Sequence, residues 1–233
     1  MPKKKPLNHH EKKLRKAGHR LIAGVDEAGK GSWAGPLVAA AVILDVENIP
    51  ENIFDSKMLS AKQREKAFVQ ITKKSISWSV HLVPAKKIDE QGIQKSNLEA
   101  LTLAVKKLHV KPQAILVDAF KITYGNRPVV NIINGDALER SIGAASIIAK
   151  VVRDRLMSSE IHRSHPKYEF ATHKGYGTSL HRKLLLKHGV SPEHRKSFSP
   201  VKDMLEKKPK VSKKPKKRLV LKKGKATKAK RKK

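Results

Sequence analysis

No cysteine occurs among the 233 residues of this chain. Its absence excludes a disulfide framework and a zinc site built on thiolates. Long hydrophobic runs are also missing: no apolar stretch approaches the roughly 20 residues of a membrane-spanning helix. No signal-peptide core follows the basic N-terminus either, because residues 21–23 lead directly to Asp26. These absences predict a cytoplasmic protein that does not enter a membrane.

Acidic residues are scarce at both ends of the chain. Residues 207–233 hold sixteen Lys or Arg and no Asp or Glu, and residues 1–20 hold eight basic residues and one acid. The two ends therefore carry +23 of the formal net charge of +32. A basic N-terminal extension (1–20) and a disordered Lys-rich tail (202–233) would bind nucleic acid, a ribosome or any acidic surface. The milder remainder, 21–201, is long enough for one domain with a core.

Hydrophobic spacing predicts an α/β domain. The strands are expected at 21–27, 37–44, 75–83, 114–118 and 128–133, and the helices at 61–74, around 98–108, at 137–161 and at 179–188. Ser60, with Gln63 three residues later, is typical of a helix N-terminus. Strands come first and then alternate with helices, which favours one mixed sheet.

Four acids stand where these elements begin or end: Asp26 and Glu27 close the first strand, Asp118 closes a later one, and Asp136 opens the long helix. A cluster of like-charged carboxylates is costly unless a cation neutralises it. Oxygen ligands without His or Cys suit Mg²⁺ or Mn²⁺ rather than zinc. Two such ions would activate a water and hold the leaving oxygen of a phosphodiester.

Other readings of the acids are open. Asp136 and Glu139 also have the spacing of a capping box for the helix at 137–161. Asp118 could be an ordinary turn residue. Asp26 and Glu27 are harder to explain in this way, because adjacent strand residues face opposite sides of a sheet and charges in an apolar segment do not favour stability.

A glycine-rich loop follows the first acids. Its spacing, with Gly29, Gly31 and Gly35, fits neither the dinucleotide fingerprint nor the phosphate-binding loop, and Pro36 leads into a strand rather than a helix. The alternatives are a tight turn and a loop whose backbone approaches a ligand closely, since glycine has no Cβ.

An aromatic residue stands between two glycines near residue 176. Tyr176 could stack on a sugar or base, and His173 and Lys174 could reach phosphates. Alternatively, the tyrosine packs its ring and exposes its hydroxyl. Histidine is frequent in this part of the chain, but the spacing is not that of a metal site.

Together these motifs resemble ribonuclease HII of the bacterial type, over about residues 21–201. The segments that carry the resemblance, in the family's order, are 24–31 with 34–36, 55–59 with Arg64, Asp118 at its strand end, 135–154, 173–181 and 189–198. Each motif is modest evidence by itself, and six in order are strong evidence.

The resemblance implies a ribonuclease H-like fold, with a five-stranded mixed sheet flanked by helices and a C-terminal helical segment. It implies a monomeric endonuclease that hydrolyses the RNA strand of RNA–DNA hybrids, including single ribonucleotides embedded in DNA, and leaves 5′-phosphate and 3′-hydroxyl ends. Its expected metal-binding catalytic residues are Asp26, Glu27, Asp118 and Asp136, with Mn²⁺ or Mg²⁺. Its expected substrate-binding residues are Gly29, Lys30, Gly31, Lys57, Lys150, Arg153, His173, Lys174 and Tyr176.

In that family the glycine loop reads the 2′-hydroxyl, which distinguishes RNA from DNA, and the motif tyrosine stacks on the next deoxyribose. This chain has Lys30 where the family commonly has Arg. If the guanidinium fork matters, phosphate contact is weaker here, and if the backbone amides read the sugar, recognition survives. The related ribonuclease HIII carries an extra N-terminal domain, for which the ~20 residues before the first strand are too few.

Two other functions compete. A non-catalytic nucleic-acid or ribosome-binding protein would account for the basic ends, but it has no use for Asp26 and Glu27 beside a glycine loop. A DNA exonuclease or junction resolvase of similar fold would use the acids. The segments around Lys30 and Tyr176 instead favour an enzyme that reads a ribonucleotide.

The tail generates a test of its own. We expect a truncation after Glu206 to bind duplexes more weakly and with a shallower salt dependence, because each lost phosphate contact lowers the log–log slope by roughly 0.9. Cut site and saturated rate should stay the same, since no proposed ligand lies in the tail. Duplex binding over a salt series and product mapping check this. Equal salt slopes would indicate a solubilising or ribosome-associating extension instead.

Overall fold

The computed structural model describes residues 6–50, 53 and 56–206. Of the expected disordered tail (202–233), residues 207–233 lie outside the described residues, as does Asp55, whereas residues 202–206 form a helix that begins at Val201 and are therefore not disordered as expected. Within the described part, no helix combines the length and the apolar character needed to cross a membrane.

Five strands form one mixed sheet, as predicted, in the order β3-β2-β1-β4-β5. Strands β1, β2 and β3 pair antiparallel, whereas β4 pairs parallel with both β1 and β5. Their bounds are β1 Ile22–Ala28, β2 Leu37–Leu44, β3 Ser75–Val83, β4 Ala114–Asp118 and β5 Val129–Ile132. Strand β1, which carries two of the predicted acids, therefore lies in the centre of the sheet.

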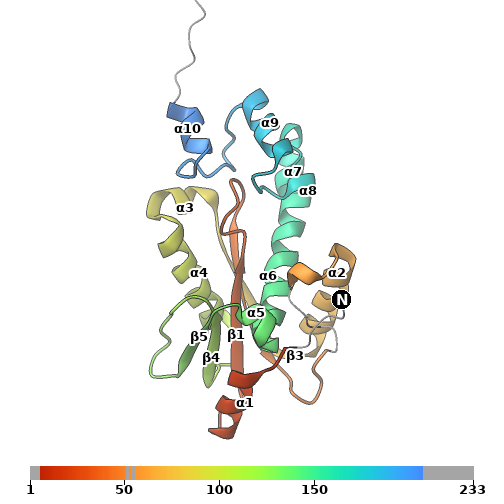
Figure 1. Cartoon of the computed structure of the whole chain (residues 1–233), viewed down its shortest axis with the longest axis vertical. Coiled ribbons are helices and arrows are strands. Elements are labelled where there is room, and N and C mark those ends of the chain that lie inside the picture. Colours follow the sequence, from red (N-terminus) through yellow and green to blue (C-terminus); the bar gives the residue numbers. More distant parts are fainter. Residues whose placement is uncertain (1–5, 51–52, 54–55, 207–233) are drawn as a thin grey trace, which may run out of the picture.

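The helices cover both faces of this sheet and extend beyond its ends (Figure 1). The α-helices are α1 His9–Lys16, α2 Ala61–Lys74, α3 Ala85–Gln91, α4 Ile93–Lys107, α5 Gly135–Leu138, α6 Arg140–Ser158, α7 Glu160–Ser164, α8 Phe170–His173, α9 Ser179–His188 and α10 Val201–Glu206. Short 3₁₀ turns lie at η1 Ser56–Met58 and η2 Pro166–Tyr168. The Ser60–Gln63 capping box at the start of α2 is present, as predicted.

Two apolar cores lie on opposite faces of the sheet. Strand β2 supplies both: Ala39 and Ala41 face the core against α4, while Val38, Ala40 and Val42 face the core against α6. A strand buried on both faces is expected to be an uninterrupted apolar run, which is what 37–44 is. The small side chains at these positions let both helices approach the sheet closely.

In the edge strand β3 the serines are buried and the large apolar residues are exposed, the reverse of what its alternating pattern favours. Its apolar residues alternate with polar ones, yet Ser77 is 1% exposed, whereas Ile76 and Trp78 are 38% and 37% exposed. The buried face is the one under α4, where Ser79 donates to the Ala104 carbonyl. Small hydroxyl side chains fit beneath a closely packed helix and find hydrogen-bond partners there, so the larger apolar side chains lie on the more open face.

The predicted long helix at 137–161 is broken at Glu139. This residue has extended backbone (φ −123°, ψ 128°) between α5 and α6 and makes no side-chain cap to α6. The predicted capping box of Asp136 and Glu139 is therefore absent. The Glu139 carboxylate instead accepts hydrogen bonds from the amides of His10 and Glu11 in the N-terminal helix α1. Asp136 consequently lies in a separate short turn rather than at the start of α6.

Helix α6 crosses the central strand at Gly24. A Cβ added there would lie 2.0 Å from the Ser141 carbonyl carbon and 2.3 Å from the Ile142 nitrogen. Backbone therefore contacts backbone, and no side chain fits between. This close approach places α6 directly over the strand segment that ends in Asp26 and Glu27.

We expect Gly24→Ala to destabilise the fold by about 3 kcal/mol or more, since the clash is with backbone that cannot rotate away. Gly31→Ala is a matched control, because a Cβ there meets no atom within 4 Å. Chemical denaturation of both variants measures the difference. A Gly24→Ala protein as stable as the control would mean that α6 can shift away from β1.

Candidate active site

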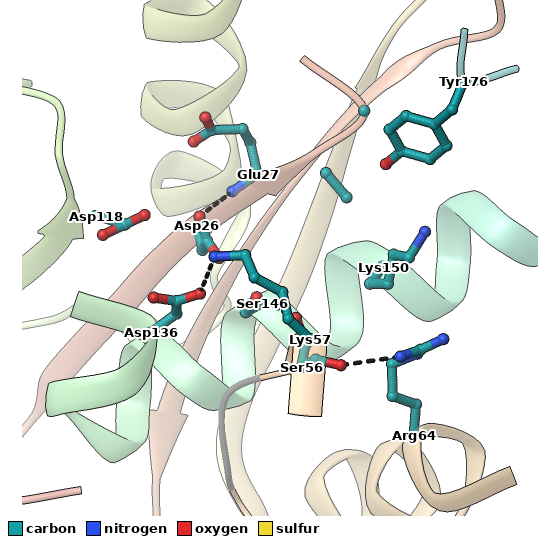
Figure 2. A pocket seen from close by; sticks show the side chains of 12 residues that line it. Asp26, Glu27, Ser56, Lys57, Arg64, Asp118, Asp136, Ser146, Lys150 and Tyr176 are labelled. Atoms are coloured by element: carbon teal, nitrogen blue, oxygen red, sulfur yellow. Dashed lines mark hydrogen bonds and ion pairs between the residues drawn. The ribbon is translucent and has the colours of Figure 1, made fainter. Parts of the chain in front are cut away.

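The parallel pairing of β1 and β4 brings the first acids together. Val25 pairs with Val117, so Asp26 and Asp118 follow at the same level on neighbouring strands. Asp26 lies on the α6 face, near Ser146, and Glu27 lies on the α4 face, near Asn97. In Figure 2 the Asp26 and Asp118 side chains lie near Asp136, whereas the Glu27 carboxylate points away from Asp136.

The fourth acid is placed by a tight turn after β5. Asn134 adopts a left-handed conformation (φ 57°) just before α5, and the Gly135 amide donates to Asp118 Oδ1 over 2.7 Å. Asp136 is 2% exposed and accepts a hydrogen bond from Lys57 Nζ at 2.7 Å. Three chain segments therefore bring carboxylates together, as the sequence predicted.

Burial and mutual repulsion make it costly for Asp26 and Glu27 to be charged. Burial, reinforced by Glu27 and Asp118, raises the pKa of Asp26 well above its usual value. Burial also raises the pKa of Glu27 to about 7, with Asp118 adding to the shift and Lys30 opposing it. An arrangement this unfavourable for charge indicates a site built for a cation, because stability alone would not select it.

The four acids line one cavity of about 290 Å³, together with Gly29, Lys57, Lys150 and Tyr176. The donors fit a hard cation: all are oxygens, and Glu27 Oε2 is buried without a hydrogen-bond partner among the described residues. As the described side chains stand, no three His, Asp or Glu are grouped closely enough to hold an ion. The carboxylates surround the cavity, and Lys57 supplies the positive charge beside Asp136.

The glycine loop is held from behind by two buried arginines, Arg153 and Arg195, each 0% exposed. Arg153 donates to the carbonyls of Pro36 and Ala34, and Arg195 donates to those of Gly35 and Lys30. Neither forms an ion pair with a carboxylate in the described part of the chain. Burial lowers the pKa of Arg195 to about 9. The loop backbone is thus fixed by cations that bind only neutral groups.

Arg153 therefore differs from the expectation that it binds substrate directly. Its Nε would lie 1.9 Å from a Cβ at Gly29, so the loop lies directly on the guanidinium. The Tyr176 ring packs over it, 5.0 Å from the guanidinium carbon, and Lys150 Nζ lies 4.8 Å from the same ring. Arg153 positions both the loop and the tyrosine, whereas Lys150 and Tyr176 line the cavity itself.

His173 is also not at the surface. Its Nε2 donates to the Tyr168 carbonyl and its Nδ1 accepts from the Gly175 amide. It stacks on His181 with ring centroids 4.1 Å apart, and His181 bonds His194 over 3.0 Å. Burial lowers the pKa of His181 to about 4 and of His194 to about 3, so this stack is neutral and holds the segment that carries Tyr176.

The remaining predicted residues, Lys30, Gly31 and Lys174, are not among those that line this cavity. Lys30 is held over the Phe120 ring at 3.9 Å, and a Cβ at Gly31 would meet no atom within 4 Å. Lys174 bonds Ser158 and the Ala171 carbonyl and lines a neighbouring cavity, which it shares with Arg64.

Sequence reasoning did not select three polar residues that line the cavity, Ser56, Arg64 and Ser146. Ser56 and Ser146 share a hydrogen bond of 2.9 Å, and Arg64 donates to the Ser56 carbonyl. All three lie in segments that resemble ribonuclease HII, and that was the only signal available for them.

The fold and the acids at its strand ends define a nuclease of the ribonuclease H-like class. The ribonuclease HII profile matches residues 23–201. Ribonuclease HII of Caldicellulosiruptor saccharolyticus is 47% identical over 188 residues, 81% of this chain and 91% of that protein. That of Acidothermus cellulolyticus is 45% identical over 194 residues, and the match spans 82% of this chain but 63% of the longer relative.

Among solved structures, ribonuclease H2 of Pyrococcus horikoshii matches with a TM-score of 0.67 and 29% identity, over 78% of this chain and 96% of that one. Bst-RNase HIII, solved with Mn²⁺, shares the fold at a TM-score of 0.59 and 19% identity, over 79% and 69% of the two chains. The chain belongs to the ribonuclease HII family, endonucleases that cleave the RNA strand of RNA–DNA hybrids.

The raised pKa of Glu27 predicts how the metal-free protein responds to pH. The folded carboxyl holds its proton up to about pH 7, whereas the unfolded one loses it near 4.5. This contribution to stability is therefore present below pH 4.5 and lost as pH rises through about 7. We expect the melting temperature to fall between pH 5.5 and 8.

In Glu27→Gln this fall should be smaller, while the exposed Glu47→Gln control should keep it. Melting curves in the presence of a chelator measure the difference. If Glu27→Gln and the wild type show the same pH slope, Glu27 does not hold its proton in the folded protein.

Proposed function

We propose that Asp26, Glu27, Asp118 and Asp136 are the catalytic metal-binding residues with which this chain hydrolyses the RNA strand of RNA–DNA hybrids. The observation that carries the proposal is the convergence of four carboxylates from three chain segments on one cavity, with Asp26 and Asp136 buried and Glu27 and Asp118 half-buried. A non-catalytic binding protein would not maintain such repulsion, and acids at a nucleic-acid surface repel phosphate.

The acids would hold Mg²⁺ or Mn²⁺, and two such ions would supply the charge that activates a water and stabilises the leaving oxygen. The chain's own residues place the strand. Lys57 pairs with Asp136, yet its side chain is 74% exposed, so it can also meet a phosphate of the strand to be cut. Lys150 presents a second cation from α6. Hydrolysis would leave 5′-phosphate and 3′-hydroxyl ends.

Recognition of the ribonucleotide would come from Gly29, Lys30 and Gly31 together with Tyr176. Two hydrogen bonds join these segments, because the Trp33 and Ala34 amides both donate to the Gly175 carbonyl. A loop and a stacking residue that are fixed to each other can read two neighbouring sugars as a unit. This supports cleavage at single ribonucleotides embedded in DNA, with the loop on the ribose and Tyr176 on the deoxyribose that follows.

Such substrates arise during DNA replication, and we propose that the enzyme works as a cytoplasmic monomer in ribonucleotide excision repair. The direct test is incubation of the purified chain, with Mg²⁺ or Mn²⁺, with a duplex that contains one ribonucleotide. We expect one internal cut, dependent on metal. Degradation from an end, or binding without cleavage, would contradict the proposal.

We expect Asp118→Asn to abolish cleavage without unfolding the protein, since it removes a metal ligand and keeps the side chain's shape. The metal-free variant should melt no lower than the wild type, because one source of repulsion on Asp26 is lost. Asp26→Asn should behave in the same way. Cleavage rates and melting curves test this, and near-normal rates would remove these residues from the mechanism.

Tyr176→Ala should reduce cleavage most on the lone ribonucleotide, where the RNA-to-DNA step is the feature being read. The stacking lost there is worth roughly 1–3 kcal/mol. Tyr176→Phe keeps the ring and is the matched control. Rates on the lone ribonucleotide and on a long hybrid give the comparison. An equal loss on both substrates would make Tyr176 a packing residue only.

A further inference from the structure

The N-terminal helix α1 lies outside the segment that matches the ribonuclease HII profile, which begins at residue 23. It was expected to be part of a basic extension. In the structure it lies beside β4 and the start of α6, at the end of the sheet opposite α9 and α10 (Figure 1). We propose that α1 is a positioning element that keeps Asp136 in the active site.

Two glutamates form reciprocal hydrogen bonds at this contact, each with backbone amides at the N-terminus of the opposite helix. The carboxylate of Glu139, 0% exposed, accepts from the amides of His10 (2.9 Å) and Glu11 (3.1 Å) in the first turn of α1. The carboxylate of Glu11, 6% exposed, accepts from the Ser141 amide at the start of α6, over 2.8 Å. Each helix thus supplies the negative charge that the other's N-terminus favours.

Asn8 adds two hydrogen bonds to the backbone on either side of the break between α5 and α6. Its amide donates to the Leu138 carbonyl at 2.9 Å, and its side-chain oxygen accepts from the Arg140 amide at 2.9 Å. The last residue of α5 and the first residue of α6 are therefore both tied to the chain just before α1. The break between α5 and α6 is therefore held by contacts with the N-terminal segment.

This break decides where Asp136 lies. Helix α5 is four residues long and cannot hold its own position. Its start is fixed to Asp118 through the Gly135 amide, and its end is fixed by α1. Asp136, between these two attachments, is thereby held against the cavity and Lys57.

The local sequence also offers a competing arrangement. Asp136 and Glu139 have capping-box spacing, so α5 and α6 could join into one helix with Asp136 as its N-cap. In that arrangement the Asp136 carboxylate would bind helix amides. Glu11 and the first turn of α1 engage the Ser141 amide and Glu139, and this leaves the Asp136 side chain free for the active site.

The inference rests on the proposed role of Asp136, and the test separates the two. We compare Glu11→Ala, Glu11→Gln, the exposed neighbour Lys12→Ala and Asp136→Asn. Mn²⁺ affinity is measured by calorimetry on the metal-free protein, and kcat and KM are measured on a hybrid duplex, all well below the melting temperature.

Glu11→Ala should lower kcat about tenfold or more, because a misplacement of about 1 Å at a reacting group costs up to ~100-fold. It should weaken Mn²⁺ binding severalfold and leave KM nearly unchanged, since no group that touches the duplex is removed. Glu11→Gln keeps an oxygen acceptor for Ser141 and should recover most of the loss. Lys12→Ala should match the wild type.

If Glu11→Ala only melts earlier, with kcat and Mn²⁺ affinity unchanged, α1 is a stabilising element and the inference fails. If Asp136→Asn binds Mn²⁺ and cleaves normally, the assignment of the site fails and the positioning role fails with it. Should Glu11→Ala not fold, Asn8→Gly removes the cap at Arg140 and suits the left-handed backbone of this residue (φ 53°), and it must show a smaller shift in kcat and Mn²⁺ affinity, again with KM unchanged. If this variant shows no shift in kcat or Mn²⁺ affinity, the inference is equally overturned.

Discussion

Repulsion between carboxylates that cannot move apart is the constraint on which the structure depends. Asp26 and Asp118 are fixed by the register of two neighbouring central strands, and Asp136 is fixed by hydrogen bonds on both sides of its turn. Burial makes the charge of Asp26 costly, and the neighbouring Glu27 and Asp118 add to that cost. Strand pairing and backbone hydrogen bonds therefore hold the carboxylates together against their mutual repulsion. Binding of a cation would offset the free energy that this repulsion costs.

The substrate-facing loops are held by a different kind of contact. Arg153 and Arg195 donate hydrogen bonds to backbone carbonyls, and the rings of His173, His181 and His194 contact one another as a neutral cluster. No carboxylate is used to fix either loop in the described residues. The contacts that fix these loops therefore add no negative charge to that of the four acids.

Much of this could be predicted from the sequence, where short-range rules apply. Four strands follow from apolar runs and β3 follows from alternation, and Asp26 and Glu27 stand out because charges at the end of a buried strand have no stabilising purpose. Resemblance added the roles of Lys57, Lys150 and Tyr176, which line the cavity.

What could not be predicted depended on partners far away in the chain. The break at Glu139 requires α1, about 130 residues earlier, and the buried serine face of β3 requires α4. Arg153 and His173 were expected to bind substrate, Arg153 from the resemblance and His173 because its side chain could reach a phosphate. Their burial follows from loop carbonyls and ring partners that local patterns do not show.

The strand order has a consequence for synthesis of the chain. β1 is made early, but its parallel neighbour β4 begins about 90 residues later, and the turn with Asp136 follows after that. A nascent chain that has emerged only as far as β3 carries two of the four carboxylates and no partner for the open edge of β1. Pairing over so long a separation is slow to form. If the four acids are the catalytic residues proposed above, the polypeptide becomes a nuclease only late in its translation, when α5 and α6 have left the ribosome and can close onto a sheet that is already half built.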